Sequence, residues 1–464
     1  MNKSSKKANP YIPNSVPELR DYMLKEIGVK DVDELYSEIP EDLRYRKKLN
    51  IPEPLTSEYE LKKHMEGLLS KNRDCNETLS FLGAGCYQHY IPAVVDEVIG
   101  RGEFLTAYQG ATYTDKGRYQ VVFEYVSMLT ELLGMEVAGM PTFDSYTASS
   151  TGIRMAGRIT ERDEILIPGT ISPERLAHIK GYCKDIMDIT MVDFDMKTGL
   201  IDLEDLKSKM SEDTAGLFIE NPGYLGFIEN RWEEISTLVH DNESVLVVGV
   251  NPMSLGLLEA PGCYGADIVV GDGQPLGVHM QCGGGTTGFV AVKDDETFIN
   301  ELPTLLWSIA DLENGDEGFG FTAGRAGRLS YTAREDSVEF TGTATGLWSV
   351  ANAVYMSLMG PQGMKEIGET IIEQSHYAKK KISEIEGLTL PVQTPHFNEF
   401  LVNFDQTGKT IAEINKKLLS HNIFGGKDIS DEFPGYGQSA LFCISEIHSK
   451  ADIDKLCDCL KEVI

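Results

Sequence analysis

The sequence predicts an α/β fold in which helices cover both faces of a mostly parallel sheet. Two observations carry this prediction. Short segments rich in Val, Ile and Leu recur at spacings of about 20 to 30 residues between residues 164 and 272. Amphipathic segments of helical character separate them. Such alternation is typical of strands that are buried on both faces of a parallel sheet.

The length of the chain allows more than one domain. With 464 residues, it is long enough for two domains and an arm. We expect a helical arm over residues 1–72, a large α/β domain over 73–330 and a small α+β domain over 331–464. Short arm helices bury little on their own, so we expect the arm to pack across a larger body or a partner subunit.

Three short helices are predicted in the arm. "SVPELRDYMLKEIG" begins with a serine cap at Ser15 and with Pro17, and it ends at Gly28. "DVDELYSEIP" and "SEYELKKHMEGLLSK" follow the same pattern, and "RKKLNIPEPL" is an extended connector between them.

Five predicted strands make up the centre of the sheet. They are "EILIP" (164–168), "DITMVDF" (188–194), "AGLFIEN" (215–221), "SVLVVGV" (244–250) and "ADIVVGD" (266–272). In a parallel sheet, ligands bind beyond the carboxyl ends of the strands. We therefore expect the functional site at that edge.

The C-terminal part begins with a long helical segment that is broken near "GPQG" (360–363). The strands "FLVNFD" (400–405) and "ALFCISEI" (440–447) follow it. This order suits a small α+β domain.

Composition excludes several classes of function. The formal net charge of −30 repels nucleic acid and anionic membrane surfaces. No run approaches 18 apolar residues, and the basic segment "MNKSSKKANPYIPNS" contains no apolar h-region, so we expect no signal peptide in it. The eight cysteines are scattered without paired CxxC spacing, so we expect no metal site. These features predict a soluble cytoplasmic protein.

The stretch from Ala266 to Val292 contains a strand, a polar turn, the glycine run "GGGTTG" (283–288) and a second strand, but no lysine. The glycine run precedes a strand and does not open a helix, which argues against dinucleotide binding. Such glycines more often let the backbone turn tightly or approach another subunit.

Two loops are candidates for ligand contact. "FLGAGCYQHYIPAVV" (81–95) contains Tyr87 and His89, and "GEFLTAYQGATYTDKGRYQ" (102–120) contains Tyr108 and Gln109. Aromatic hydroxyls and an imidazole on glycine-containing loops suit the mouth of a ligand site. A tyrosine-rich packing seam between subunits explains the same composition, so composition leaves both open.

Several long strings resemble one family. "FLGAGCYQHYIPAVV", "GRYQVVFEYVSMLTELLGMEVA", "NPMSLGLLEAPGCYGADIVVGDGQPLG" and "ANAVYMSLMGPQGM" occur in an order similar to that of the alpha subunit of split glycine cleavage system P-proteins. The resemblance covers nearly the whole chain. It implies a pyridoxal-phosphate (PLP) transferase architecture of fold type I. It also implies glycine as substrate, a beta subunit that carries the PLP lysine, and a lipoyl H-protein that receives the aminomethyl group.

The resemblance locates the expected cofactor positions in this chain. The lysine would stand near Gln274, which cannot form a Schiff base, while Lys293 lies at the far end of the next strand. Asn251 stands where a carboxylate partner of the pyridine nitrogen is expected. Ser149, Ser150 and Thr151 of "FDSYTASSTG" lie in the segment expected to bind the phosphate. The chain is thus expected to hold no PLP covalently and to complete the site of its beta partner through Tyr87, His89, Tyr108 and Gln109.

Two segments depart from the family pattern. Residues 110–117 are one residue shorter, with Asp115 as their only carboxylate, and residues 332–347 have lost most of the positive charge. These departures leave two alternatives to glycine decarboxylation. One is a non-catalytic paralogue that acts as a scaffold or senses an anion at Ser149–Thr151. The other is a part of a decarboxylase for another amino acid.

Overall fold

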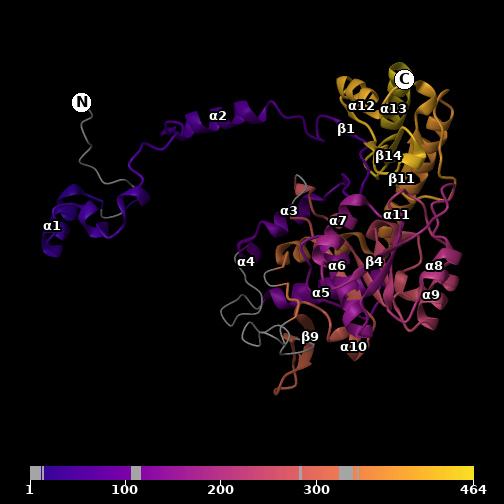
Figure 1. Ribbon diagram of the computed structural model, residues 1–464, viewed down its shortest axis with the longest axis horizontal. Coiled ribbons are helices and arrows are strands. Elements are labelled where there is room, and N and C mark those ends of the chain that lie inside the picture. The colour runs from indigo at the N-terminus through magenta and orange to yellow at the C-terminus, as the bar shows by residue number, and fades with distance from the viewer. Residues whose placement is uncertain (1–11, 13–14, 106–116, 282–284, 323–337, 342–343) are drawn as a thin grey trace. The chain divides into compact units, whose positions relative to one another are not determined.

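A computed structural model describes residue 12 and residues 15–105, 117–281, 285–322, 338–341 and 344–464 (Figure 1). The chain divides into two compact units, Met1–Asn72 and Arg73–Ile464. The predicted boundary near residue 330 stays a prediction, because residues 323–337 lie outside the described part.

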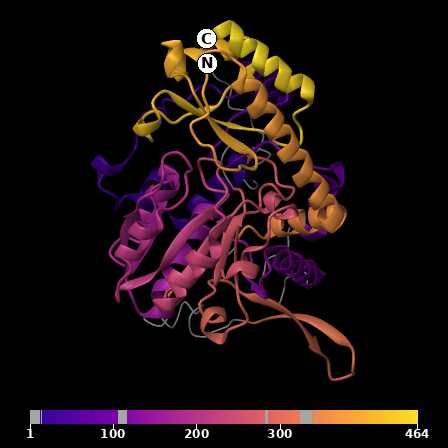
Figure 2. The ribbon, with the colours of Figure 1, turned by 90° about the vertical axis from the view of Figure 1, so that its right-hand side faces the viewer.

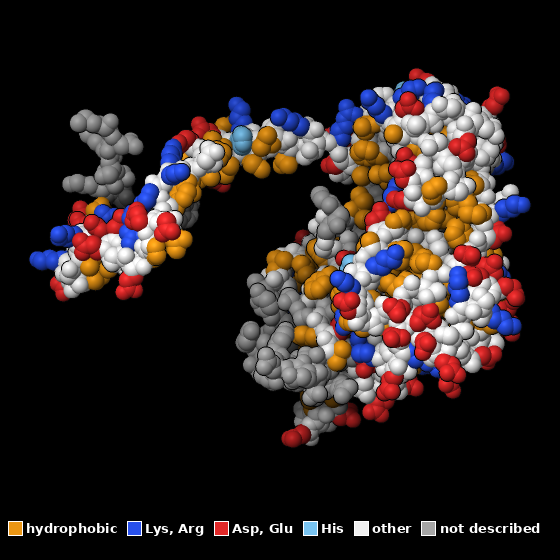
Figure 3. All heavy atoms as spheres, in the orientation of Figure 1, with side chains coloured by type: hydrophobic (Ala, Val, Ile, Leu, Met, Phe, Trp, Pro, Cys, Tyr) orange, Lys and Arg blue, Asp and Glu red, His pale blue; other side chains and the backbone are white. Residues whose placement is uncertain are grey.

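The first unit consists of short helices. These are α1 (Pro17–Ile27), the 3₁₀ helices η1 (Val32–Tyr36) and η2 (Glu41–Leu43), and α2 (Glu58–Leu69). Gly28 ends α1 in the left-handed conformation, as predicted, but the residue before the helix is Val16, without a side-chain cap. Among the described residues of this unit, Leu24 is the one large apolar side chain that is buried. Other hydrophobic side chains are visible on the surface of the unit in Figure 3.

A seven-stranded sheet forms the centre of the second unit, in the order β2-β8-β7-β6-β5-β3-β4. Strands β3 to β7 pair in parallel, and β8 and β2 are antiparallel at one edge. The strands are β2 (Val137–Ala138), β3 (Glu164–Pro168), β4 (Asp188–Val192), β5 (Thr214–Asn221), β6 (Val245–Val250), β7 (Ile268–Asp272) and β8 (Gly288–Val292). All five predicted strands are present, so the expected parallel sheet is confirmed.

Helices cover both faces of this sheet (Figure 2). Leu217 and Ile219 of β5 belong to one apolar core, whereas Phe218 belongs to the core on the other face. This alternation follows from the two-residue period of a strand. The helices are α3 (Ala93–Ile99), α4 (Gly102–Leu105), α5 (Gly117–Leu133), α6 (Ser145–Thr160), α7 (Pro173–Tyr182), α8 (Leu203–Lys209), α9 (Trp232–Asp241) and α10 (Glu296–Ile299), with η3 (Pro252–Gly256) and η4 (Pro261–Tyr264).

The C-terminal part adds a third core. The long helix α11 (Gly346–Ser383) breaks at Gly360, whose φ is 59°, as the "GPQG" motif predicted. A three-stranded sheet of order β11-β14-β13 packs with the last helices around this core. Its elements are β11 (Glu399–Asn403), β13 (Lys427–Asp428), β14 (Ser439–Cys443), α12 (Ile411–Ser420) and α13 (Lys450–Val463).

Two small sheets complete the unit. Strand β1 (Leu79–Ser80) pairs in parallel with β12 (Ile423–Phe424). The hairpin of β9 (Leu306–Asp311) and β10 (Glu317–Thr322) extends away from the main sheet (Figure 2). No helix in the described part of the chain is long and apolar enough to cross a bilayer.

Candidate functional site

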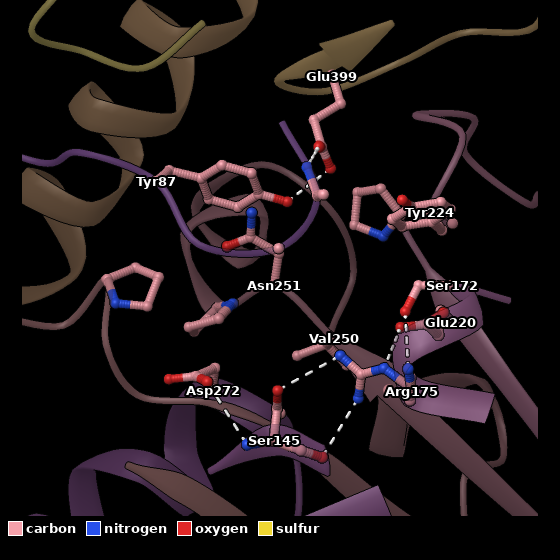
Figure 4. A pocket seen from close by; sticks show the side chains of 18 of the residues that line it. Tyr87, Ser145, Ser172, Arg175, Glu220, Tyr224, Val250, Asn251, Asp272 and Glu399 are labelled. Atoms are coloured by element: carbon pink, nitrogen blue, oxygen red, sulfur yellow. Dashed lines mark hydrogen bonds and ion pairs between the residues drawn. The ribbon is translucent and has the colours of Figure 1, made fainter. Parts of the chain in front are cut away.

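A cleft lies at the carboxyl ends of β5, β6 and β7, where a parallel sheet is expected to bind ligands (Figure 4). Glu220, Asn251 and Asp272 line it from these strand ends. Tyr87 and Glu399 line it from the opposite side. The cavity volume is about 70 Å³, which is room for a few water molecules.

Arg175, in the first turn of α7, brings positive charge to the cleft. Its Nε lies 3.1 Å from a carboxylate oxygen of Glu220. Its Nη1 donates to the Ser145 carbonyl at 3.2 Å (Figure 4). The same nitrogen donates to the Ser149 hydroxyl at 2.6 Å. Because both charged side chains are largely buried, solvent screens the pair only weakly. Arg175 thereby joins β5 to the beginnings of α6 and α7.

Carboxylates outnumber cations among the lining residues. Burial raises the pKa of Asp272 to about 6, and it raises the pKa of Glu399 to about 7. Both values lie above the ordinary carboxylate range because the charged forms are desolvated. A cleft with this composition disfavours a phosphate group or another anion.

The beginning of α6, which faces the cleft, is capped by the chain's own carboxylates. Asp144 accepts a hydrogen bond from the Thr147 amide at 2.7 Å. Asp272 accepts a longer one from the Ser145 amide at 3.4 Å and one from the Thr286 hydroxyl at 3.3 Å. A helix N-terminus attracts anions through such amides. Here those amides already have anionic partners.

Ser149, Ser150 and Thr151 lie inside α6, and none of them lines the cleft. Because α6 begins at Ser145, the three hydroxyls lie on later, buried turns, and their expected contact with a phosphate stays a prediction. The Ser149 hydroxyl donates to the Ser145 carbonyl, and Ser150 pairs with His178.

Gln274, near the expected place of the PLP lysine, is 3% exposed and does not line the cleft. Its side-chain amide donates to the Val278 carbonyl at 2.8 Å. Asn251 lines the cleft, and its side-chain oxygen accepts from the Met253 amide at 3.1 Å, which caps η3. Both amides serve the local backbone.

PLP does not fit the residues of this cleft. No lysine is among the described lining residues, and Lys293 instead pairs with Asp267 at 2.8 Å. The amides that would hold a phosphate are capped by Asp144 and Asp272. A lysine for the Schiff base and a site for the phosphate are two of the parts that a protein supplies to a PLP centre. This chain supplies neither at its own cleft.

Strand β8, which follows the glycine run, begins at Gly288 in close contact with the backbone of Asp144. A Cβ on Gly288 would lie 2.1 Å from the Asp144 carbonyl oxygen. Packing within the chain is therefore sufficient to explain why glycine is needed at this position.

The loop that contains Tyr87 is hydrogen-bonded to Glu399 in the C-terminal part of the chain. The Tyr87 hydroxyl donates to Glu399 at 2.5 Å, and the Ala84 amide donates to the same carboxylate at 2.6 Å. Burial holds the pKa of Tyr87 well above its ordinary value. Tyr87 thus lies at the cleft, where the sequence predicted a ligand contact, but its hydroxyl is already bound.

His89 is buried and does not line the cleft. Its side chain is 1% exposed, and its Nδ1 lies 2.7 Å from Glu446. Burial alone would raise the pKa of Glu446, but hydrogen bonds from His89 and the Tyr90 amide outweigh it and leave the pKa below its ordinary value. Tyr108 and Gln109 lie outside the described residues, so their predicted roles stay predictions.

Part of the diverged segment 332–347 is anchored to α6 and α7. Glu339 is buried, and it accepts hydrogen bonds from the Thr151 hydroxyl at 2.8 Å and the Tyr182 hydroxyl at 2.6 Å. Arg158 lies 3.4 Å from its second oxygen. Most of residues 110–117 lies outside the described part.

Sequence reasoning did not single out Arg175, Glu220, Asp272 or Glu399. Glu220 and Asp272 stand at the carboxyl ends of predicted strands, which was a sufficient signal to propose them. Arg175 follows a predicted helix start, without any pattern that marks its partner. Glu399 comes from a distant part of the sequence, and no local pattern indicates that it reaches the cleft.

Comparison with protein families gives a match over almost the whole chain. The model described as glycine cleavage system P-protein matches residues 9–460. The probable glycine dehydrogenase (decarboxylating) subunit 1 of Staphylothermus marinus is 36% identical over 467 residues, covering 98% of each chain. The protein of the same name from a Geobacillus species is 37% identical over 445 residues, covering 96% of this chain and 97% of the relative.

Solved structures match the fold. The crystal structure of a glycine decarboxylase (P-protein) of the glycine cleavage system, in inhibitor-bound form, gives a TM-score of 0.85 at 29% identity, covering 99% of this chain and 100% of that one. A sphingosine-1-phosphate lyase of Burkholderia pseudomallei gives a TM-score of 0.66 at 14% identity, covering 92% and 94%. The second likeness supports the fold alone. Together they confirm the predicted PLP-transferase architecture of fold type I.

The buried Glu399 predicts a pH-dependent stability. Because burial raises its pKa from 4.5 to about 7, the folded chain keeps a proton that the unfolded chain releases between these pH values. This stabilisation is complete below pH 4.5 and is lost as pH rises through 7. Glutamine has no proton to lose, so we expect the free energy of unfolding of Glu399→Gln, relative to that of wild type, to rise by up to about 3 kcal/mol from about pH 5 to pH 8.

Urea unfolding of both chains at the two pH values measures this gain. Glu229→Gln is the matched control, because Glu229 is a buried carboxylate that binds Arg231 and does not line the cleft. If the difference in unfolding free energy between wild type and Glu399→Gln were the same at both pH values, the prediction would be contradicted.

The Arg175–Glu220 pair predicts non-additive stability. Arg175→Met leaves the Glu220 charge largely buried without its cation, so we expect a loss of about 3 kcal/mol in unfolding free energy. Adding Glu220→Gln removes that charge, and we expect the double variant to recover at least about 1 kcal/mol. A double-mutant cycle in urea tests this, and strictly additive effects would refute the coupling.

Proposed function

Because this chain belongs to the glycine cleavage system P-protein family, we propose that it is subunit 1 of a two-chain glycine decarboxylase. The observation that supports the proposal is a PLP-transferase fold whose cleft has no lysine among its described lining residues and whose α6 start is capped by Asp144 and Asp272. A second chain, the beta subunit, carries the cofactor lysine. The pair removes CO₂ from glycine and transfers the aminomethyl group to the lipoyl arm of the H-protein.

The division of labour follows from the chemistry of the cleft. PLP, bound by the partner, supplies the electron sink for the carbanion that remains after loss of CO₂. This chain performs no covalent step. Its contribution is to complete the walls of the partner's site, to orient the substrate and to exclude water.

Hydrogen bonds within the chain support a different role for two of the predicted pocket residues. Tyr87 and His89 face inward to Glu399 and Glu446, so we propose that they shape their loop and do not themselves reach the partner's substrate. Tyr108 and Gln109 keep their proposed role at the shared site. The complete enzyme is proposed to be a cytoplasmic heterotetramer.

An anion sensor at Ser149–Thr151 receives no support, because these hydroxyls are buried in α6 and bonded to the chain. The charge of the cleft also argues against an anionic metabolite there. Glycine decarboxylation is therefore the function that the site and its relatives support best.

Reconstitution tests the proposal. We expect the isolated chain to show no visible absorbance of bound PLP, and the pair with its lysine-bearing partner to bind PLP and exchange the glycine carboxyl group with bicarbonate when H-protein is present. PLP bound covalently to the isolated chain would overturn the assignment. A well-folded pair that binds PLP but exchanges another amino acid would identify a different substrate.

A lysine alone should not restore cofactor binding. We expect the Gln274→Lys chain to bind no PLP without its partner, because Asp144 and Asp272 still cap the start of α6. Spectroscopic titration of this variant with PLP provides the measurement, and wild type serves as control. Stable, stoichiometric PLP binding by the variant would show that the caps do not exclude the phosphate.

A further inference from the structure

Two carboxylates from the C-terminal part hold the loop between Gly83 and Tyr90. Glu399 accepts hydrogen bonds from the Ala84 amide and the Tyr87 hydroxyl at one end of the loop (Figure 4). Glu446 accepts from the Tyr90 amide at 2.7 Å and bonds to Nδ1 of His89, also at 2.7 Å, at the other end. The loop is therefore fixed to the same small sheet region at both ends.

The backbone between these two points adopts a conformation that needs such support. Ala84 has a φ of 82° and Gly85 a φ of 91°, in the left-handed region. A residue other than glycine rarely adopts this region unless its surroundings enforce it. A Cβ on Gly83 would lie 2.6 Å from Glu399 Oε1. The glycine thus permits close approach of the carboxylate that holds Ala84.

The fixed loop turns one aromatic side chain outward. Tyr90 is 66% exposed although its amide is bound to Glu446, whereas Tyr87 and His89 are buried. His89 Nε2 is buried without a hydrogen-bond partner among the described residues. Tyrosine loses little conformational entropy on binding, and it is common among the residues that dominate interfaces.

We propose that Glu399 and Glu446 are positioning residues that preset this loop, and that Tyr90 is the side chain it presents to the cofactor-bearing partner subunit. The inference rests on the proposed function and adds to it the residues that hold the contact. The carboxylates do not touch the reacting atoms. They act through the backbone of the loop and through Tyr87 and His89.

Reconstituted pairs test the role of Tyr90. Tyr90→Ala changes an exposed side chain and is expected to leave unfolding by urea unchanged. We expect it to weaken partner binding or lower kcat by about 10- to 100-fold, as for a central aromatic contact. Tyr90→Phe keeps the ring and is expected to retain most of the binding. Wild-type affinity and wild-type kcat in Tyr90→Ala would overturn the proposed contact.

The two carboxylates are tested by conservative and severe variants. Glu446→Ala and Glu399→Ala are expected to lower kcat by about 10-fold or more, with little change in KM for glycine, because a displaced loop misplaces the contact. Glutamine at either position keeps an acceptor for the loop amide, so Glu446→Gln and Glu399→Gln are expected to recover kcat to within about 3-fold of wild type. Glu229→Gln is the matched control.

Hydrogen exchange on the chain without its partner gives a readout that does not depend on activity. We expect faster exchange of the Ala84 amide in Glu399→Ala and of the Tyr90 amide in Glu446→Ala, with protection in α6 unchanged. Unchanged exchange in both variants would refute the positioning role. If the wild-type pair lacks glycine exchange, the proposed function fails, while partner affinity of Tyr90→Ala and hydrogen exchange still decide this inference.

Discussion

The need to compensate buried negative charge governs the cleft and everything that meets there. Glu220 and Asp272 lie at the carboxyl ends of β5 and β7 in the parallel sheet, whereas Glu399 begins β11 of the small C-terminal sheet. Each carboxylate binds a different element. Glu220 pairs with Arg175 of α7, Asp272 accepts a hydrogen bond from the first amide of α6, and Glu399 accepts one from the loop before α3. The carboxylates consequently join the large sheet to its helices and to the C-terminal part.

The same compensation determines what the cleft can no longer do. In a PLP centre, the start of a helix and a strand-end loop hold the phosphate of the cofactor. In this chain, Asp272 and Asp144 take those positions. Their hydrogen bonds contribute to a stable fold at the place where a related enzyme needs an open anion site. The same amides cannot be capped by Asp144 and Asp272 and also bind the phosphate of a cofactor.

The sequence was sufficient for the fold and for the place of the site. The segment "EILIP" became β3 residue for residue, and the break at Gly360 followed from the local Gly-Pro sequence. Local patterns were weaker at helix starts: Asp144 before "SYT" was an available cap signal, yet the phosphate site was expected several residues later. The contacts of Glu399 and Glu446 with the loop at residues 84–90 span more than 300 residues, and only tertiary packing brings them together.

The capped start of α6 also bears on how this chain evolves. A return to cofactor binding would require a lysine near Gln274, removal of the Asp272 carboxylate and new partners for the amides it now caps. A lysine alone leaves the capped amides in place, and removal of Asp272 alone leaves the described cleft without a lysine. Under the proposed function, a gene for this chain is therefore useful only in a genome that also encodes its second subunit.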